Sequence, residues 1–472
     1  MTSPENVMNT STSAASTDTG VVALLIEALG DRVSTDAADL QRARTDKSGH
    51  IAAGTPLAIV TALTVEDVQQ TMRIATLTGT PVVTRGAGTG LAGGAIADEG
   101  EIVLSTMGMA AILEISTDDE IAVVEPGIIN AELNAVLATK GLWFAPDPAS
   151  RAISTVGGNI ATNAGGLLCA KYGVTREAVS GLSVVLADGT LLELGHRTVK
   201  GVTGLDLTAL FIGSEGTLGV IVGATLRLRR LPTGGAVTIG AYFSSVEAAA
   251  RAASVISSSG LRPAIMELVD HQAMAGIAQY LDLEWRDGSS YLLVQFDGSG
   301  SGVDADAAVA IMRSLGGDAE LTTDQAEAER LFAVRRAFHP AMETRGTVLI
   351  EDVCVPRSAL PAMFQAIADI EVRFGVTIPT VAHAGDGNLH PNFVFESEPE
   401  AENGVPAVIW AAADELFLAA LRLGGTLTGE HGVGLLKRRW LGHELGATQL
   451  DLQRQIKAVF DPQGLLNPGK VF

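Results

Sequence analysis

Two histidines on either side of a tight turn offer a metal site in HAGDGNLHP, residues 383–391. Asp-Gly between two apolar runs is typical of a β-hairpin, because both central positions of a type I′ turn need positive φ. With Asp386 and Gly387 as a two-residue loop, His383 and His390 lie directly opposite each other, with Cβ atoms about 4.5–5.5 Å apart. Two imidazoles at that distance can share one metal ion, and the sequence must then supply a third ligand. The alternative is two polar side chains on an exposed hairpin face.

Glycine-rich segments offer a second kind of chemistry, the binding of phosphate. RGAGTGLAGGA, residues 85–95, contains G-x-G-x-x-G at Gly88, Gly90 and Gly93. A Rossmann fingerprint must open a helix, but the following IADEGEIVLST predicts a turn and a strand. The segment is therefore expected to bind an anion with its own backbone N–H groups, the alternative being a flexible loop. A second such segment, PDPASRAISTVGGNIATNAGG at 146–166, would wrap a large bisphosphate ligand from the other side.

Length, charge and cysteine usage narrow the class of protein. A chain of 472 residues is too long for one ordinary core, so two or three domains are expected. The net charge of −22 argues against nucleic acid as a partner. Two cysteines, Cys169 and Cys354, cannot build a disulfide framework, which fits a reducing cytoplasm. No apolar run reaches the roughly 18 residues of a transmembrane segment, while a peripheral membrane contact stays open.

The order of elements predicts an α+β protein. LAIVTALTVEDVQQTMRIATLTGTPVVT reads as strand, helix and strand, with Thr64 and Asp67 as a capping pair and Gly79 at the helix end. Short strands and glycine-rich turns follow, then helices around the hairpin, and a long helix at AVIWAAADELFLAALRLGG. The expected parts are a disordered tail at 1–20, a first domain at 21–232, a second domain with the hairpin at 233–430, and a helical C-terminal segment at 431–472.

A series of motifs carries a family resemblance over about residues 50–472: PVVTRGAGTGLAGGA, PDPASRAISTVGGNIATNAGG, KYGVT, IGSEGTLGVI, HAGDGNLHPN, GEHGVG and NPGK. Together they resemble the FAD-linked oxidase family, with the fold of vanillyl-alcohol oxidase and p-cresol methylhydroxylase. Within it they resemble the D-2-hydroxyacid dehydrogenase branch: D-lactate dehydrogenases, D-2-hydroxyglutarate dehydrogenases and the flavin subunit of glycolate oxidase. The resemblance implies a p-cresol methylhydroxylase-type FAD-binding domain at 21–232 and an α+β substrate (cap) domain at 233–430. The segment 431–472 would return to the flavin and complete the active site.

The resemblance also implies noncovalent FAD, because RGAGTG lacks the histidine that some relatives use for a covalent flavin link. The first glycine-rich segment would hold the pyrophosphate, the second would line the flavin, and the end of IGSEGTLGVI would touch the adenine. The implied cofactor-binding residues are Arg85, Gly86, Ala87, Gly88, Thr89, Gly90, Leu91, Pro146, Asp147, Thr155, Gly157, Gly158, Asn159, Asn163, Gly165, Gly166, Gly219, Val220, Ile221 and Asn467.

The resemblance offers a candidate for the missing third metal ligand in GEHGVG. In the relatives, two histidines of H-x-G-D-G-N-x-H and the glutamate of G-E-H-G bind a divalent metal, which here implies His383, His390 and Glu430. Two imidazoles favour zinc or manganese over calcium, with iron as a further alternative. Three ligands leave a position open, where a 2-hydroxy acid can bind through its carboxylate and hydroxyl oxygens, and the ion lowers the hydroxyl pKa.

His431 resembles the general base of the family, and a neutral imidazole suits proton abstraction at neutral pH. Neighbouring residues of an extended segment point to opposite sides. Glu430 and His431 can therefore serve one site only on an irregular backbone, which Gly429 and Gly432 can provide. The alternative for this pair is an exposed polar turn.

Two further side chains are implied to bind the substrate. Arg335, in the helical RLFAVRRAFHPAMETRG, matches an arginine that grips the substrate carboxylate, and Asn392 matches a substrate-contacting asparagine. Where D-2-hydroxyglutarate dehydrogenases carry a threonine and a lysine, this chain has His339 and Ile350. A clamp for a second carboxylate is therefore not expected. This favours D-lactate or a glycolate-like acid over 2-hydroxyglutarate.

The predicted activity is oxidation of a D-2-hydroxy acid to the 2-keto acid, with the C2 hydride passing to FAD and the hydroxyl proton to His431. The electron acceptor stays open among a quinone, an electron-transfer flavoprotein, a cytochrome and oxygen, and a homodimer is one open assembly. One alternative is a D-2-hydroxyglutarate dehydrogenase. Others are a flavin subunit of a larger glycolate oxidase with little activity alone, and a metal-dependent hydrolase that uses the same three ligands.

Overall fold

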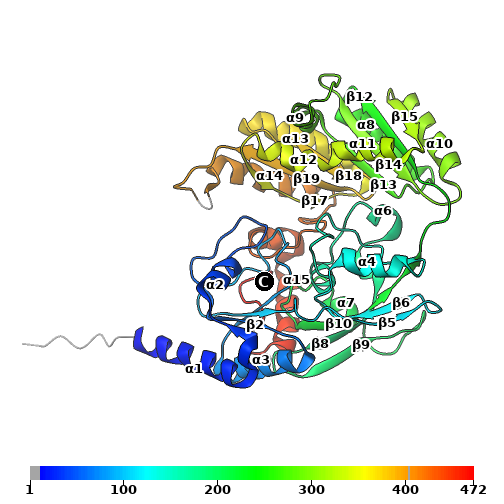
Figure 1. Ribbon diagram of the computed structural model, residues 1–472. Helices are drawn as coiled ribbons and strands as arrows, with labels where there is room; N and C mark the ends of the chain where they lie inside the picture. Colours follow the sequence, from blue (N-terminus) through cyan, green and yellow to red (C-terminus); the bar gives the residue numbers. More distant parts are fainter. Residues whose placement is uncertain (1–10, 402–403) are drawn as a thin grey trace, which may run out of the picture.

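Residues 11–401 and 404–472 are described by the computed structural model, which has two lobes (Figure 1). The chain begins in one lobe with α1 (Ser11–Leu29). Val21, Leu25 and Leu29 recur every four residues along this helix and are buried. Of the tail expected to be disordered, positions 1–10 lie outside the described residues. Its remaining part is helical, because α1 extends towards the N-terminus from this buried stripe.

The first sheet of this lobe contains β1 (Val33–Ser34), β2 (Ala58–Thr61), β4 (Ile102–Ser105) and β3 (Val82–Arg85), in that spatial order. β2 and β3 both pair in parallel with β4, and α3 (Val65–Thr78) connects them. The expected strand-helix-strand unit is confirmed, with a capping box between Thr64 and Asp67 and left-handed Gly79 at the helix end. β3 runs into the first glycine-rich segment, and the next regular element is β4, without an intervening helix.

A second sheet in the same lobe is antiparallel. Its order is β5 (Ile112–Ser116), β6 (Ile121–Val124), β10 (Val220–Arg227), β8 (Val179–Val185) and β9 (Leu191–Gly195). Short helices lie between β6 and β8 along the chain: α4 (Asn130–Ala138), α5 (Val156–Thr162) and α6 (Cys169–Tyr172). The second glycine-rich segment forms α5 and the loops on both sides of it.

The other lobe is built on an eight-stranded sheet. Its order is β15 (Asp318–Thr322), β12 (Val237–Phe243), β14 (Ser290–Phe296), β13 (Ile265–Val269), β18 (Thr380–His383), β19 (Asn388–Phe395) and β16 (Thr347–Ile350), with β17 (Val353–Cys354) also on β19. The α+β architecture is therefore confirmed. The domain boundaries themselves stay predictions.

Helices cover both faces of this sheet. α8 (Val246–Ser258), α10 (Ser301–Ser314), α13 (Leu360–Phe374) and α14 (Ala407–Arg422) pack on one face. α9 (His271–Leu281), α11 (Gln325–Arg336) and α12 (Phe338–Glu343) pack on the other. Side chains alternate between the faces along each strand. Val269 and Val381 belong to the α9 face, so Glu267 and His383, two positions away on the same strands, project from that face as well.

The hairpin is present, but its predicted register is wrong. The loop has four residues, 384–387, and β18 and β19 pair His383 with Asn388 and Val381 with His390. The two-residue turn needs positive φ at both Asp386 and Gly387, and only Gly387 has it, at 92°. The backbone N–H groups of both residues instead donate to the carbonyl oxygen of His383. A slip of two residues keeps every side chain on its face, so the two histidines become diagonal neighbours.

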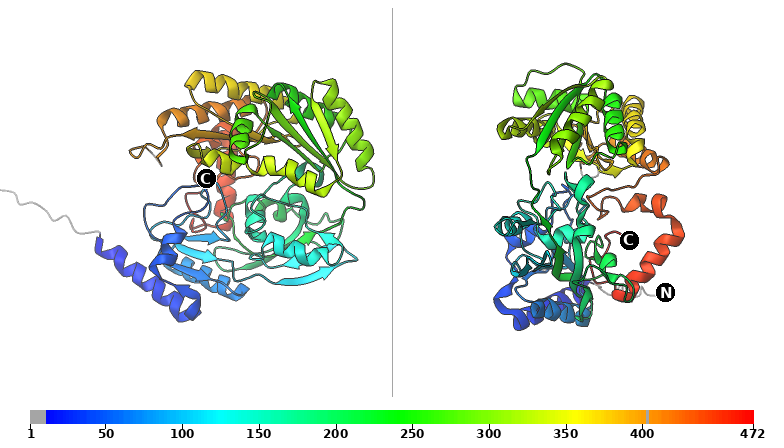
Figure 2. Two further views of the ribbon diagram at one scale, coloured as in Figure 1. Left: turned by 45° about the horizontal axis from the view of Figure 1, so that its top comes forward. Right: turned by 90° about the vertical axis from the view of Figure 1, so that its right-hand side faces the viewer.

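After α14 the chain returns to the first lobe, as Figures 1 and 2 show in red. α15 (Leu441–Phe460) bends at Gly446, and the end of the chain then joins the edge of β3. The N–H of Val82 donates to the carbonyl oxygen of Leu465, and the N–H of Asn467 donates to that of Val82. Among the described residues, no helix combines the length and apolar character that a membrane crossing requires.

Candidate active site with a metal centre

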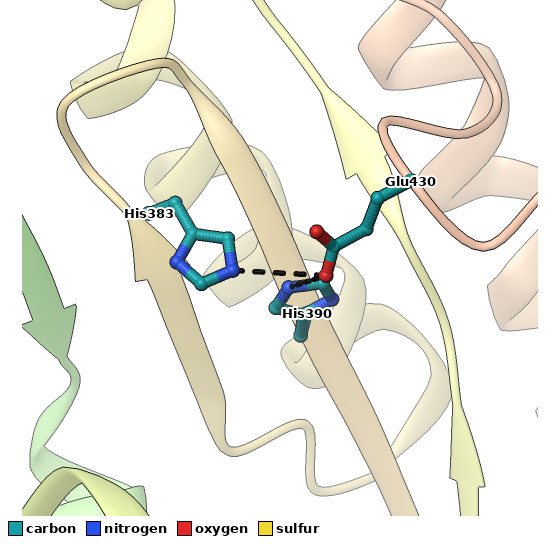
Figure 3. Close-up of side chains that lie close together, drawn as sticks. All are labelled: His383, His390 and Glu430. Atoms are coloured by element: carbon teal, nitrogen blue, oxygen red, sulfur yellow. Dashed lines mark ion pairs between the residues drawn. The ribbon is translucent and has the colours of Figure 1, made fainter. Parts of the chain in front are cut away.

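His383, His390 and Glu430 converge at the end of the hairpin (Figure 3). His383 ends β18, His390 lies in β19, and Glu430 lies in the loop between α14 and α15. The Oε1 atom of Glu430 is 3.7 Å from Nε2 of His383 and 3.1 Å from Nε2 of His390. One ligand atom from each residue lies within 4.8 Å of the other two. Two imidazole nitrogens and one carboxylate oxygen form a donor set that fits zinc or manganese.

Asp352 holds the loop that carries Glu430. Its Oδ2 atom accepts the backbone N–H groups of Glu430 at 3.1 Å and His431 at 3.0 Å, and the Thr428 hydroxyl at 2.5 Å. Such a turn needs an irregular backbone, and Gly432 has φ of 86°. With this backbone, Nε2 of His431 lies 3.9 Å from Oε1 of Glu430, while a shared role of the two residues in one site stays a prediction.

The first lobe contacts the same loop a few residues further along the chain, at residues 433 and 434. Glu215, which is buried, accepts the N–H of Val433 with Oε1 and the N–H of Gly434 with Oε2, both at 2.8 Å. A Cβ atom on Gly434 would lie 2.1 Å from the carbonyl oxygen of Ala92, so only glycine fits there. The loop with Glu430 is thus held between carboxylates from both lobes.

His431 lies against the metal centre. Its ring stacks on that of His390 with centroids 5.1 Å apart and an angle of 15°. Its Nε2 atom is 3.9 Å from Oε1 of Glu430. Burial lowers the pKa of His431 to about 4, against the attraction of Asp352 for the charged form. The ring is therefore neutral at pH 7 and can accept a proton.

The pKa values of two of the candidate ligands, His383 and Glu430, are strongly shifted. Burial opposes a charge on His383, but Glu267 and Glu430 raise its pKa well above the ordinary value. Burial likewise disfavours the charged form of Glu430, yet His383 and His390 lower its pKa well below the ordinary value. A metal ion binds the neutral imidazole, so its binding must displace the proton of His383.

Arg335 and Asn392 lie on the same side of the sheet. The Nε atom of Arg335 donates to Oε2 of Glu267 at 2.7 Å, and Oε1 of Glu267 is 2.6 Å from Nδ1 of His383. Asn392 follows His390 by two positions on β19, and its Oδ1 atom is buried without a hydrogen-bond partner. The structure thus brings the proposed substrate side chains together with the metal ligands.

The two glycine-rich segments touch each other. A Cβ atom on Gly86 would lie 2.5 Å from the hydroxyl oxygen of Thr155, and Gly88 has φ of 68°. Thr155 caps α5 by accepting the N–H of Gly158. Near them, the Oδ1 atom of Asn467 is buried without a partner while its Nδ2 donates to two carbonyl oxygens. Close backbone packing and an unpaired buried acceptor fit the expected FAD.

The second glycine-rich segment also reaches the metal centre. A Cβ atom on Gly165 would lie 2.6 Å from Oε2 of Glu430, and one on Gly166 would lie 2.4 Å from the carbonyl oxygen of Asp147. Burial raises the pKa of Asp147 to about 7, while the backbone N–H of Leu168 opposes the shift. The segment expected to line the flavin therefore packs directly against Glu430, a candidate metal ligand.

Some residues expected at the cofactor have partners within the protein. Asn159 bonds to Asn130 and Ser154, and the side chain of Asn163 accepts the N–H of Arg176. Val220 and Ile221 are buried in the cores of the first lobe, and a Cβ atom on Gly219 would lie 2.5 Å from Val184. A contact between residues 219–221 and FAD stays a prediction, which must involve the backbone.

Three acidic residues of the site were not identified from the sequence: Glu215, Glu267 and Asp352. Each is buried. Glu267 is a lone acid in the apolar strand IMELV, and buried carboxylates require partners. A single acid in an apolar strand could have indicated that Glu267 has a functional partner. The sequence could not show which partner, because the partners of Glu267 are distant along the chain.

The fold is that of a known class of flavoproteins. The structure of p-cresol methylhydroxylase with bound substrate superposes with a TM-score of 0.78 at 18% sequence identity, covering 97% of each chain. A 4-ethylphenol oxidase from Gulosibacter chungangensis superposes with a TM-score of 0.75 at 17% identity, covering 100% of this chain and 98% of that one. At these identities the likeness defines the fold alone.

Sequence comparison identifies the family. Residues 56–195 match an FAD binding domain, and residues 235–471 match the C-terminal domain of FAD linked oxidases. The chain is 38% identical over 425 residues to the glycolate oxidase subunit GlcD of Bacillus subtilis, covering 88% of this chain and 89% of that protein. It is 35% identical over 410 residues to a D-lactate dehydrogenase of Archaeoglobus fulgidus, covering 86% and 89%. The chain belongs to the FAD-linked oxidase family, whose members are oxidoreductases.

A D-2-hydroxyglutarate dehydrogenase of Stutzerimonas stutzeri is 33% identical over 457 residues, covering 93% of this chain and 96% of that protein. The relatives thus carry the names of three different 2-hydroxy acids. The predicted family and its branch are confirmed by these matches, and a hydrolase is excluded as the class.

We predict that purified protein is yellow and releases FAD on denaturation. Gly88→Ala should lower the FAD content, because the new Cβ would lie 2.3 Å from Nη2 of Arg85 and would displace this side chain, which bonds to the carbonyl oxygen of Ala95 in the expected pyrophosphate loop. Gly100→Ala is the matched control: Gly100 also has positive φ, at 80°, but nothing lies within 4 Å of its Cβ position. The ratio of flavin to protein absorbance measures both. A colourless protein that takes up no added FAD would contradict the cofactor assignment.

We also predict one divalent metal per chain. His383→Ala and His390→Ala should each lose it, since two remaining ligands bind weakly. His443→Ala, an exposed histidine of α15, is the control and should retain metal. Elemental analysis gives the stoichiometry. A fully active preparation without metal rules out the centre.

Proposed function

We propose that this protein oxidises a small D-2-hydroxy acid to the 2-keto acid with noncovalent FAD and one divalent metal, zinc or manganese. The observation that carries the proposal is the contact at Gly165, where the segment expected to line the flavin packs against the metal ligand Glu430. A substrate between these two parts would face the flavin with its C2 atom and the metal with its oxygens. The names of the relatives, glycolate oxidase subunit and D-lactate dehydrogenase, support this substrate class.

Different side chains of this protein would bind the substrate and accept its proton. When bound, FAD supplies the hydride acceptor, and the metal supplies a Lewis acid for the carboxylate and hydroxyl oxygens of the substrate. His431 accepts the hydroxyl proton at Nε2, because this nitrogen faces the metal ligand Glu430 and burial keeps the ring neutral. Arg335 binds the carboxylate with its Nη atoms, which have no hydrogen bond to the described residues. Asn392 offers an unpaired Oδ1 atom.

The residues near Asn392 bear on whether the substrate has a second carboxylate. Ile350 pairs with Asn392 across β16 and β19, so an apolar side chain lies next to the substrate asparagine. His339 is paired with Glu343 at 3.2 Å on a half-exposed surface of α12. Ile350 offers a second carboxylate no positive charge, and the side chain of His339 already has Glu343 as its partner. These contacts favour D-lactate or a glycolate-like acid over 2-hydroxyglutarate.

A second candidate is a flavin subunit of a larger glycolate oxidase. The Bacillus subtilis relative is named as a subunit of such an enzyme. In that case a partner chain would take the electrons, and the isolated chain would have little activity with its own acceptor. The electron acceptor is otherwise a quinone, an electron-transfer flavoprotein, a cytochrome or oxygen. The proposal includes a cytoplasmic location, with a peripheral membrane contact if the acceptor is a quinone.

A substrate screen of the isolated chain with an artificial dye as acceptor tests the proposal. We expect D-lactate or glycolate to give the highest kcat/KM and D-2-hydroxyglutarate to give at least tenfold less, an energy difference of about 1.4 kcal/mol. Reduction of the flavin by substrate without dye separates the candidates, because a subunit would reduce its flavin but turn over slowly. If no 2-hydroxy acid bleaches the flavin, the proposed function is wrong.

His431→Ala should lower kcat by about 10²–10⁴-fold, the usual contribution of a positioned general base. Metal and FAD should both stay, because His431 is neither a proposed ligand nor part of the glycine-rich segments. Stopped-flow measurement of flavin reduction reports the step directly, with His443→Ala as control. A variant with unchanged flavin reduction would show that another group takes the proton.

A further inference from the structure

Glu267 joins two parts of the site that the sequence keeps far apart. It lies in β13, near the middle of the eight-stranded sheet, and its side chain is fully buried. Its Oε1 atom is 2.6 Å from Nδ1 of His383, and its Oε2 atom accepts Nε of Arg335 at 2.7 Å. Glu267 and His383 are direct partners in the register of β13 and β18. One buried carboxylate thus bonds to a metal ligand and to the arginine proposed for the substrate carboxylate.

We propose that Glu267 is a positioning residue that fixes the metal ligand His383 and the substrate arginine Arg335 as a single unit. Metal binding and recognition of the substrate carboxylate would then share one anchor. The part that concerns Arg335 rests on the proposed function, while the part that concerns His383 rests on the metal centre alone.

The His383 contact determines which nitrogen is free for a metal. With its Nδ1 atom bonded to Glu267, His383 presents Nε2 towards Glu430, which lies 3.7 Å away. A carboxylate on the second nitrogen of a ligating histidine fixes the orientation of the ring and strengthens it as a donor. Glu267 therefore fixes the ring orientation of His383 in the absence of metal.

The contact with Glu267 occupies the Nε side of the planar Arg335 guanidinium and leaves its Nη atoms free of hydrogen bonds to the described residues. Arg335 lies in the last turn of α11, a helix that packs against the sheet. Its Nε atom is used by Glu267, so the remaining N–H groups keep a defined direction for a bidentate contact. A long side chain without such an anchor would lose rotamer freedom on binding the substrate.

A neutral amide cannot replace this carboxylate. Glu267 uses both oxygens as acceptors, whereas glutamine has one acceptor oxygen and one N–H₂ donor. Glu267→Gln would therefore direct an N–H₂ group at one of two donors and would also remove the negative charge beside His383. The nearby Asp270 is an instructive contrast. It is buried too, but it accepts backbone N–H groups, those of Ala273 and Thr380.

The experiment compares Glu267→Gln with wild type and with Asp270→Asn as the control of matched burial. Zn²⁺ is titrated into metal-stripped, FAD-loaded protein in competition with a chelator. Glu267→Gln should weaken Zn²⁺ binding about 10–100-fold, as loss of a partner behind a ligating histidine does. At saturating Zn²⁺, its KM for D-lactate should rise about tenfold or more, with a smaller fall in kcat, because contacts made equally in ground and transition states act on KM. Asp270→Asn should leave both values within twofold of wild type.

Wild-type Zn²⁺ affinity in a folded, FAD-loaded Glu267→Gln variant overturns the proposal. If that variant does not fold, the charge-balanced Glu267→Gln/Arg335→Gln replaces it, and wild-type Zn²⁺ affinity there overturns the proposal as well. Weakened Zn²⁺ binding with an unchanged KM for D-lactate refutes the shared anchor. If wild-type protein does not oxidise D-lactate, the proposed function fails on that substrate, while the Zn²⁺ titration still decides the role of Glu267 at His383.

Discussion

The carboxylate of Asp352 is the contact on which the active site depends. It binds three groups of the loop at 428–431 with a single oxygen, while its other oxygen accepts Nδ2 of Asn388 at 2.6 Å from the hairpin strand β19. The hairpin and the loop are separate segments, and the strand contact between them runs through β17, which pairs with β19 and, at Cys354, with Thr426. By holding both, Asp352 brings Glu430, the third candidate metal ligand, to the two histidines. Burial alone would raise its pKa, but Lys437, His431 and His390 lower it well below its ordinary value.

The same loop ties the two lobes together. Glu215 of the first lobe binds the N–H groups of Val433 and Gly434, and the carbonyl oxygen of Ala92 accepts the N–H of Leu435. The segment after the candidate metal ligand Glu430 and the proposed proton acceptor His431 is therefore joined to the first glycine-rich segment and to Glu215 through hydrogen bonds of its backbone N–H groups. Since backbone groups have no rotamer freedom, such contacts can hold the parts of a site in a fixed relation.

Paired charges make this buried site possible in a chain with a net charge of −22. A buried carboxylate without a partner costs several kcal/mol. Here Glu267 bonds to His383 and Arg335, and Lys437 lies 3.7 Å from Oδ2 of Asp352 and donates to two carbonyl oxygens. These cations near the site thus offset the repulsion that the net negative charge of the chain would otherwise exert on an anionic substrate.

Much of the site could be predicted from the sequence, because it is written in short motifs. The H-x-G-D-G-N-x-H and G-E-H-G spacings identified His383, His390 and Glu430, whose atoms the structure brings together. The capping pair at Thr64 and Asp67 and the strand after the first glycine-rich segment were also correct. The capping pair and the strand depend on neighbours a few residues away, so local sequence determines them. The third ligand, Glu430, was instead implied by the resemblance of its motif to that of the family, because no local rule joins it to the hairpin.

The hairpin register could not be predicted from its sequence. The four-residue loop closes with hydrogen bonds to the carbonyl oxygen of His383, and Asn388, the register partner of His383, also donates to Asp352, which is distant in the sequence. The roles of Glu267 and Asp352 could not be predicted for the same reason, since their furthest partners, His383 and Lys437, lie 116 and 85 positions away along the chain. The sequence by itself determined which residues could hold a metal and a flavin. Only the tertiary structure decided which buried carboxylates orient them, because a carboxylate finds its partner in space and not along the chain.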